Sequence, residues 1–203
     1  MALDTTSITD AALDLLREEG VDGVTFRKLT ARLGVKAPAI YWRFASKQEL
    51  LEAMGEAILS GPLGDLAPHE GPEPWREWFA SRLQRLRTAM LAYPDGARVV
   101  TGARPLRTPT LGYLSEYALR AAESAGEDPA QAATAIYTAL HFTFGRVIEE
   151  QDSTGAATMD EATQADFAAR FPTVARLIAR LGDVPDPAQA TFDAGLTLIL
   201  RLP

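Results

Sequence analysis

The 203-residue sequence predicts an all-α fold in two parts, and three observations support this prediction. Apolar residues recur three and four positions apart through most of the chain, which is the spacing of one buried helix face. Capping residues and glycines separate these stretches at helical lengths. No sustained alternation of apolar and polar residues indicates a strand. We therefore expect an N-terminal three-helix domain joined by a long helix to a larger helical body.

The first helix is expected over residues 7–19, SITDAALDLLREE, after which Gly20 provides a C-terminal stop. Thr25 is a suitable N-cap for a short second helix, which Gly34 ends. Leu29 then points inward, toward the apolar stripe of the first helix. That stripe consists of Ile8, Ala11, Ala12, Leu15 and Leu16.

The third helix begins near Pro38, whose missing N–H costs nothing in a first turn. We expect it to cover APAIYWRF, residues 37–44, with Ile40 and Phe44 anchoring it to the first two helices. Ser46 and Glu49 have the spacing of a capping box, which predicts a fourth helix through ELLEAMGEAILS.

The fourth helix marks the division of the chain, with residues 1–47 in the first domain and residues 48–203 in the second. Residues 61–74 contain four prolines and three glycines and are expected to form a loop. Further helices are expected at residues 75–93, 95–102, 110–125, 129–152, 161–181 with a break at Pro172, and 187–200.

Composition excludes several classes of function. The chain has no Cys, which excludes disulfides, thiolate metal sites and Cys nucleophiles. Its two histidines, His69 and His141, are too few for a His-rich metal site. No apolar run approaches the ~18 residues of a membrane span, and the N-terminus lacks the pattern of a secretory signal. We expect a cytoplasmic protein without a cofactor and without a membrane partner.

The net charge of −7 hides a basic segment. Residues 1–47 carry seven Lys/Arg against six Asp/Glu, a net of +1, whereas residues 48–203 carry thirteen against twenty-one, a net of −8. A basic face on an acidic body can meet a polyanion while the body is repelled, although a charge run is more often a solvated helix face. Within residues 24–47, which hold no acidic residue, the basic ones are Arg27, Lys28, Arg32, Lys36, Arg43 and Lys47.

Two short helices joined at LGVK have the size and the Gly-containing turn of a helix-turn-helix. The second helix of such a unit lies in the DNA major groove and presents its first residues to base edges. With Ile40 and Phe44 pointing inward, Tyr41 and Trp42 remain on the exposed side, where large aromatics suit a binding surface. The basic segment therefore lies where it would face phosphate.

The segment VTFRKLTARLGVKAPAIYWRFASKQELLEAM resembles the DNA-binding signature of the TetR family of bacterial transcriptional regulators. Two further segments, DGARVVTGARP at 95–105 and HFTFGRVIEEQ at 141–151, resemble the regulatory core of the tetracycline-repressor branch. The resemblance implies a ligand-responsive regulator, most simply a repressor, that binds a palindromic double-stranded operator as a homodimer. A small organic inducer would release it, and helices 129–152 and 187–200 would build the dimer.

The DNA-binding residues implied by the resemblance depart from the tetracycline repressors at several positions. Ala37 and Ala39 stand where those repressors carry Gln and Thr, and Arg43 replaces a His. Ala offers only a methyl contact whereas Arg can bind guanine bidentately, so a different operator is expected. Arg27 and Lys47 would hold phosphates or a flanking base, and Trp42 would brace the recognition helix. The full implied set is Thr25, Arg27, Lys28, Lys36, Ala37, Pro38, Ala39, Tyr41, Trp42, Arg43 and Lys47.

The implied regulatory core departs further. Val100 stands at the position of the family's magnesium-coordinating His, Ala103 replaces the neighbouring Thr, and only Glu149 remains of the metal-assisting carboxylates. A divalent ion would be poorly held, so no metal is expected and magnesium–tetracycline is not expected as the inducer. We expect a mainly apolar pocket between residues 82–117 and 134–149. Its expected residues are Arg82, Leu86, Val100, Ala103, Arg104, Pro105, Tyr113, Glu116, Tyr137, His141 and Glu149.

The turn VVTGARP, residues 99–105, is expected to touch both this pocket and the body end of the fourth helix. A shift in the turn would then swing the recognition helices. Two other classes of protein stay open at this stage. An all-α enzyme would need convergent titratable groups, for which the chain shows no Ser/His/Asp spacing, phosphate loop or HExxH motif. A helical protein-binding module would need no DNA contact, and its aromatic residues and His141 would simply be core residues.

Overall fold

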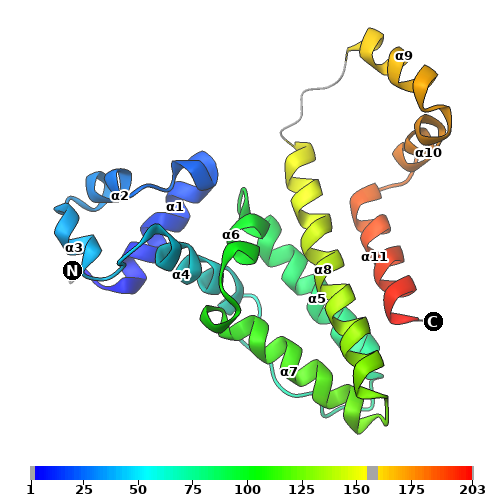
Figure 1. Ribbon diagram of the computed structural model, residues 1–203, viewed down its shortest axis with the longest axis horizontal. Coiled ribbons are helices and arrows are strands. Elements are labelled where there is room, and N and C mark those ends of the chain that lie inside the picture. The colour runs from blue at the N-terminus through cyan, green and yellow to red at the C-terminus, as the bar shows by residue number, and fades with distance from the viewer. Residues whose placement is uncertain (1–2, 155–159, 203) are drawn as a thin grey trace.

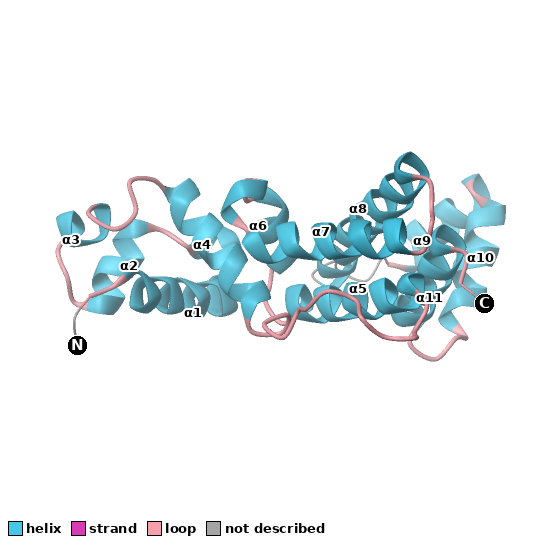
Figure 2. Ribbon diagram, turned by 90° about the horizontal axis from the view of Figure 1, so that it is seen from below, coloured by secondary structure: helices cyan, strands magenta, loops and turns pink. Residues whose placement is uncertain are grey.

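The computed structural model describes residues 3–154 and 160–202, and all regular structure within them is helical, as the sequence predicts (Figure 1). The molecule is elongated, with α1–α4 at one end and the C-terminal helices at the other (Figure 2). The elements are α1 (Thr5–Gly23), α2 (Phe26–Leu33), α3 (Ala37–Tyr41), α4 (Lys47–Ser60), α5 (Trp75–Leu91), α6 (Gly96–Gly102), the 3₁₀ helix η1 (Pro105–Arg107), α7 (Pro109–Ser124), α8 (Pro129–Thr154), α9 (Glu161–Arg170), α10 (Pro172–Gly182) and α11 (Pro187–Leu200).

Helix α1 begins two residues earlier than expected, because Asp4 and Ser7 form a reciprocal capping box. The Ser7 N–H donates to the Asp4 carboxylate at 2.8 Å, and the Asp4 N–H donates to the Ser7 hydroxyl at 3.1 Å. Gly20 has the left-handed φ of 70° expected of a stop, but the chain resumes helical turns to Gly23. The residue that was expected to end the helix therefore kinks it.

Helices α2 and α3 follow the predicted caps. The Thr25 hydroxyl accepts the Lys28 N–H at 3.3 Å, and Gly34 ends α2 with a φ of 64°. Helix α3 ends at Tyr41, short of the expected residue 44, although the Phe44 N–H still donates to the Ile40 carbonyl at 2.9 Å. Ile40 and Phe44 are buried with the α1 stripe, as expected, so they fix α3 to the rest of the domain.

The cap of α4 differs from prediction in one bond. The Ser46 hydroxyl accepts the Glu49 N–H at 3.2 Å, as in a capping box. The Glu49 carboxylate accepts the N–H of Ala45 at 2.8 Å, one residue before the cap. Helix α4 therefore starts where predicted, and its first turn also holds the loop that leads from α3.

The body is formed by α5, α7 and α8, with α11 packed against α8. Phe142 of α8 stacks on Phe192 of α11, with ring centroids 5.7 Å apart and planes 10° apart. Helices α9 and α10, interrupted at Pro172 as predicted, pack mainly against each other and project from the body (Figure 1). One apolar face of α10 is exposed, made of Val174, Leu177, Ile178 and Leu181. No helix in the described part of the chain is long and apolar enough to cross a membrane.

The contact of α8 with α11 depends on a glycine, and this gives a first prediction. A Cβ on Gly195 would collide with the Phe142 ring, whereas a Cβ on Gly145 of α8 would meet no atom within 4 Å. We expect Gly195→Ala to lower the free energy of unfolding by about 1–3 kcal/mol, the usual cost of overpacking. Gly145→Ala should raise it by up to ~1 kcal/mol, because Ala is the better helix former. Urea unfolding of both variants measures this, and equal stabilities would contradict the close packing.

Candidate DNA-binding surface and ligand cavity

The exposed surface of α3 lies at the outer end of the N-terminal domain, away from the body (Figure 1). Ala39 is half-buried in this helix. The neighbouring Arg27 is exposed on α2, whereas Thr25 and Lys28 are half-buried. The exposed residues of α3 and its flanks are Lys36, Ala37, Pro38, Tyr41, Trp42, Arg43 and Lys47. The predicted DNA-binding residues therefore share one end of the domain.

Two adjacent aromatics on this surface behave differently. The ring of Tyr41 meets Phe26 of α2 edge-on, with centroids 4.9 Å apart, and so braces α3. Trp42 was expected to do this, and that expectation is wrong because its side chain is 87% exposed. Helix α3 ends one residue earlier, so Trp42 lies in the following turn and projects into solvent.

The charges of this surface fall into two groups. Lys28 pairs with Glu19, and Arg32 donates to Glu18 at 3.0 and 2.5 Å, which lowers the pKa of Glu18. These two cations are neutralised by α1. The other basic residues of the segment, Arg27, Lys36, Arg43 and Lys47, form no ion pair within residues 3–154 and 160–202.

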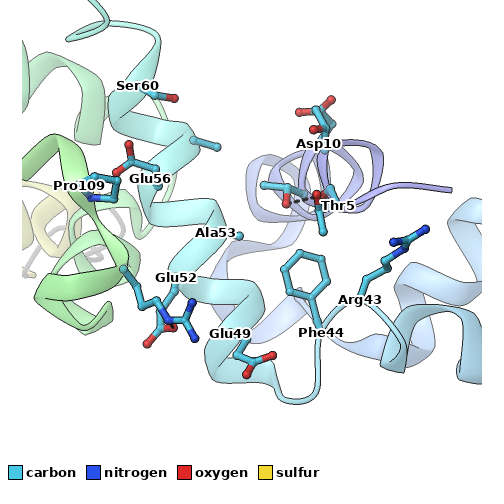
Figure 3. Close-up of a pocket in the computed structure, with 14 residues that line it drawn as sticks. Thr5, Asp10, Arg43, Phe44, Glu49, Glu52, Ala53, Glu56, Ser60 and Pro109 are labelled. Atoms are coloured by element: carbon cyan, nitrogen blue, oxygen red, sulfur yellow. Dashed lines mark hydrogen bonds and ion pairs between the residues drawn. The ribbon is translucent and has the colours of Figure 1, made fainter.

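Two of these unpaired cations rest on backbone carbonyls. The Arg43 Nη2 donates to the Leu3 carbonyl at 3.3 Å, and the Lys47 Nζ donates to the Val21 carbonyl at 3.4 Å. Figure 3 shows Arg43 extending toward α1 beside Phe44. A neutral carbonyl does not pair with a positive charge, so both side chains remain available for an anion to neutralise.

A cavity of about 530 Å³ lies in the body between α6, α7 and α8. It contains the predicted ligand residues Val100, Ala103, Glu116, Tyr137 and His141. The side chains that sequence reasoning missed follow the same helical spacing, since Leu111, Ser115 and Leu119 are four apart on α7. Extending the predicted set along α8 from His141 would have included Leu140 and Phe144. The full set of missed residues is Thr101, Thr108, Leu111, Gly112, Ser115, Leu119, Leu140 and Phe144.

Three predicted ligand residues lie apart from this cavity, for reasons visible in their packing. Leu86 is fully buried in the core of the body. Arg82 lies over the Trp78 ring at 5.2 Å and donates to the Ser81 hydroxyl at 2.8 Å. Glu149, which is exposed, accepts from Arg146 at 2.8 Å.

The other predicted residues outside the lining belong to α7 and to the turn after α6. Tyr113 is 56% exposed and stacks on Tyr117, with centroids 5.8 Å apart. Arg104 is held by Glu52 of α4. Pro105 begins η1, and its side chain lies outside the described part of the structure.

The cavity does not fit a magnesium ion. Val100, at the position of the family's metal-binding His, contributes only methyl groups to the lining. Glu149 is held by Arg146 outside the cavity. Across the described residues, no three His, Cys, Asp or Glu side chains come together as metal ligands. Hard divalent cations favour several converging carboxylates, and the lining offers a single one, that of Glu116, with no second acid beside it.

Helix α4 is attached to the segment beside the cavity by three side chains spaced four residues apart. The Gln48 Nε2 donates to the Gly102 carbonyl at 2.9 Å. Glu52, which is buried, accepts from Arg104 at 2.5 and 3.1 Å. Glu56 accepts the N–H and the hydroxyl of Thr110 at 3.2 and 2.6 Å. We call Gln48, Glu52 and Glu56 the α4 polar row.

The contact between the turn and α4 extends further along the helix than expected. Gly55, in the second half of α4, packs against Val99, Val100 and Ala103, as expected, and Gln48 in the first turn of α4 contacts Gly102 as well. Figure 3 shows Glu56 directed toward Pro109 at the start of α7, while Phe44 and Thr5 lie on the other side of α4. One face of α4 therefore contacts the regulatory segment, and the opposite side meets the DNA-binding domain.

A second attachment joins the two parts at the other end of α6. The Asp95 carboxylate, which precedes α6, accepts the Val21 N–H at 2.9 Å, next to the kink in α1. Nearby, the Arg17 guanidinium donates to the Tyr93 hydroxyl at 2.7 Å. Helix α6, which contributes Val100 to the cavity, is thus connected to α1 of the DNA-binding domain at its start and to α4 at its end.

A helix-turn-helix with unpaired cations, joined by a polar row to a body that holds a cavity, defines a ligand-responsive transcriptional regulator. Residues 8–54 match the family model for bacterial regulatory proteins of the tetR family. Residues 67–201 match the tetracyclin repressor-like C-terminal domain. The chain belongs to the TetR family.

The relatives support the same family. The tetracycline repressor protein class A from transposon 1721 of Escherichia coli is 38% identical over 200 residues, which are 98% of this chain and 89% of that protein. A TetR variant from Acinetobacter baumannii AYE, solved with minocycline, is 34% identical with a TM-score of 0.76 over 98% of this chain and 96% of that one. BioQ, solved with its double-stranded DNA operator, is 30% identical with a TM-score of 0.66 over 75% and 89%.

Membership of the family settles the class of protein. The relatives are transcriptional regulators rather than enzymes, so the all-α enzyme is excluded, and so is a helical module without DNA-binding activity. TetR-family regulators bind operator DNA as dimers.

The Glu52–Arg104 pair gives a second prediction. Arg104 lowers the pKa of the Glu52 carboxyl to about 2. The unfolded carboxyl titrates near pH ~4.3, so the pair stabilises the fold fully above about pH 5 and loses this effect as the pH falls toward about 2. Glu52→Gln should therefore be less stable than the wild type at pH 7, by a difference that shrinks on acidification. Denaturant unfolding from pH 7 to pH 3 measures it.

The matched control is Glu123→Gln, which alters an exposed carboxylate of α7. The free energy of unfolding of this control variant should stay close to that of the wild type from pH 7 to pH 3. A Glu52→Gln difference that is the same at pH 3 and at pH 7 would contradict the assigned pair.

Proposed function

We propose that the protein is a repressor that binds a palindromic operator as a homodimer and leaves it when a small organic molecule fills the cavity. The observation that carries this proposal is the position of residues 100–110. Val100, Ala103 and Thr108 contribute to the cavity, while Gly102, Arg104 and Thr110 contact the α4 polar row. One segment is thus in reach of both the ligand and the helix that leads to the DNA.

The DNA contacts follow from the exposed surface of α3. Ala37, Pro38, Ala39 and Tyr41 would line the major groove, and Arg43 would leave the Leu3 carbonyl to donate to a guanine. The remaining cations, with Thr25, would contact phosphates, which position the domain without reading sequence. Those cations are Arg27, Lys28, Lys36 and Lys47, of which Lys28 would first have to exchange its bond to Glu19.

The homodimer would bury apolar surface that one chain leaves exposed. Leu198 of α11 is 81% exposed, although Phe192, Leu196 and Leu200 of the same helix are buried. Helices α8 and α11 are therefore the proposed main interface, and the exposed apolar face of α10 extends it. Two recognition helices related by a two-fold axis would read two half-sites about one helical turn apart.

We place the boundary between the domains at residue 47, where α4 begins to contact both parts. Ligand binding would displace residues 100–110 and, through the polar row, tilt α4 and its recognition helix. Because half-sites lie ~34–36 Å apart, a shift of a few ångströms would misplace both sets of contacts. Access to chromosomal DNA requires that the protein act in the cytoplasm.

A third prediction separates the residues proposed to read bases from those proposed to hold phosphate. On a palindromic operator obtained by selection in vitro, Arg43→Ala should cost roughly 1–3 kcal/mol and relax one base position in each half-site. Lys47→Ala should weaken binding by the same factor on operator and on random DNA. A plot of log affinity against log salt concentration should become less steep, by about one unit of slope for each phosphate that the variant no longer neutralises. Fluorescence anisotropy over a range of salt concentrations measures both. If Arg43→Ala weakened binding to random DNA as much as binding to operator, the assignment would be wrong.

A further inference from the structure

The cavity carries a charge pattern that restricts its ligand. Thirteen residues line it, and none of them is Lys or Arg. Glu116 of α7 is the one formally charged side chain in this lining. It is exposed to solvent, and no ion pair involves it within the described residues. A negative charge without an ion-pair partner therefore borders a mainly apolar space.

Two hydroxyl groups on one side of the lining, those of Thr101 and Ser115, can only accept hydrogen bonds from a ligand, whereas Tyr137 and His141 of α8 can still donate. The Thr101 hydroxyl already donates to the Ala97 carbonyl at 2.8 Å. The Ser115 hydroxyl donates to the Leu111 carbonyl at 3.1 Å. Each hydroxyl has one hydrogen, so these two can offer a ligand only their lone pairs. Together with the Glu116 carboxylate, they make this side of the cavity a set of hydrogen-bond acceptors.

A ligand that fills the side of the cavity around Glu116, Thr101 and Ser115 must supply hydrogen-bond donors and a positive charge there. An anion would lose its hydration on entry, and the lining has no Lys or Arg to compensate it. A neutral molecule would leave the Glu116 charge without a partner. A protonated amine donates several hydrogen bonds and neutralises the carboxylate, and hydrogen bonds of charged groups are the stronger ones.

The rest of the lining determines the body of the ligand. Leu111, Leu119, Leu140, Val100 and Phe144 surround the space with apolar groups. Its volume of about 530 Å³ lies within the ~300–1,000 Å³ of sites for drug-sized ligands. We propose that the cavity takes an apolar organic molecule that carries a protonated amine, with the amine at Glu116 and no metal ion. This inference rests on the proposed function, because it assigns the chemical class of the inducer.

The test uses three probes that share one aromatic body and differ in charge. They are 2-(2-naphthyl)ethylamine, 2-(2-naphthyl)ethanol and 2-naphthylacetate, titrated calorimetrically into the purified wild-type dimer in the presence of EDTA. The amine should bind about tenfold more tightly than the alcohol, as expected for hydrogen bonds to a charged group. The carboxylate should bind most weakly, and EDTA should change none of the affinities.

Two variants assign the preference to Glu116. Glu116→Gln should weaken the amine about tenfold, to the level of the alcohol, and leave the alcohol within about twofold of its wild-type affinity. Glu123→Gln removes the same charge from an exposed position two turns further along α7, outside the cavity, and should change neither. The unchanged alcohol affinity also reports that the variant folds.

The outcomes separate this inference from the proposed function. If the carboxylate bound as tightly as the amine, or if Glu116→Gln kept the amine preference, the ligand class would be wrong while the cavity remained a binding site. If none of the probes bound the wild-type protein, the cavity would not be a ligand site, and the inducer half of the proposed function would fail with this inference.

Discussion

The arrangement of this protein depends on one set of hydrogen bonds, those between the α4 polar row and residues 102–110. Gln48, Glu52 and Glu56 are four residues apart, so they lie on one face of the helix. Each binds a different part of the same short segment. The segment spans the end of α6, the 3₁₀ helix η1 and the first turn of α7. Helix α4 therefore cannot rotate or slide without breaking bonds to the segment that contributes Ala103 and Thr108 to the cavity.

The polar character of this contact matters for regulation. An apolar interface tolerates small slips, whereas charged hydrogen bonds have definite lengths and directions. The buried Glu52 has its bonds supplied by Arg104 and Gln48, so a displaced Arg104 would leave a buried carboxylate without its main partner. Such a contact favours discrete positions over gradual deformation. The second attachment, between Asp95 and the kink in α1, gives α6 a fixed point about which its far end can move.

The sequence predicts those features that local rules determine. Thr25, Gly34 and Ser46 act as expected, because caps and left-handed turns depend on neighbouring residues. The anchoring of Ile40 follows from helical spacing in the same way. The Glu52–Arg104 and Arg17–Tyr93 contacts join residues far apart in the chain, and no periodicity indicates them.

Only part of the cavity lining was predicted from the sequence, because the rest depends on contacts between helices. Glu116 and His141 were found through family resemblance, whereas Thr108 and Phe144 depend on how α7 packs against α8. Trp42 shows the reverse case: helical spacing placed it on the exposed side, as the structure confirms, whereas the bracing role implied by the family resemblance is wrong. Local patterns thus give the elements and their caps, and the contacts between elements require the three-dimensional structure.

The claim that the polar row sets the position of the DNA-binding domain is tested most directly by a distance between the two recognition regions of the dimer. The chain has no Cys, so Ala31→Cys on the exposed side of α2 places one spin label on each protomer. Pulsed electron resonance should give one narrow distance distribution for the otherwise wild-type protein. Replacing Glu52 and Glu56 together by Gln should broaden or shift it, while Glu123→Gln should not. An unchanged distribution in the double variant would contradict the account, because α4 would then be held by something other than its polar row.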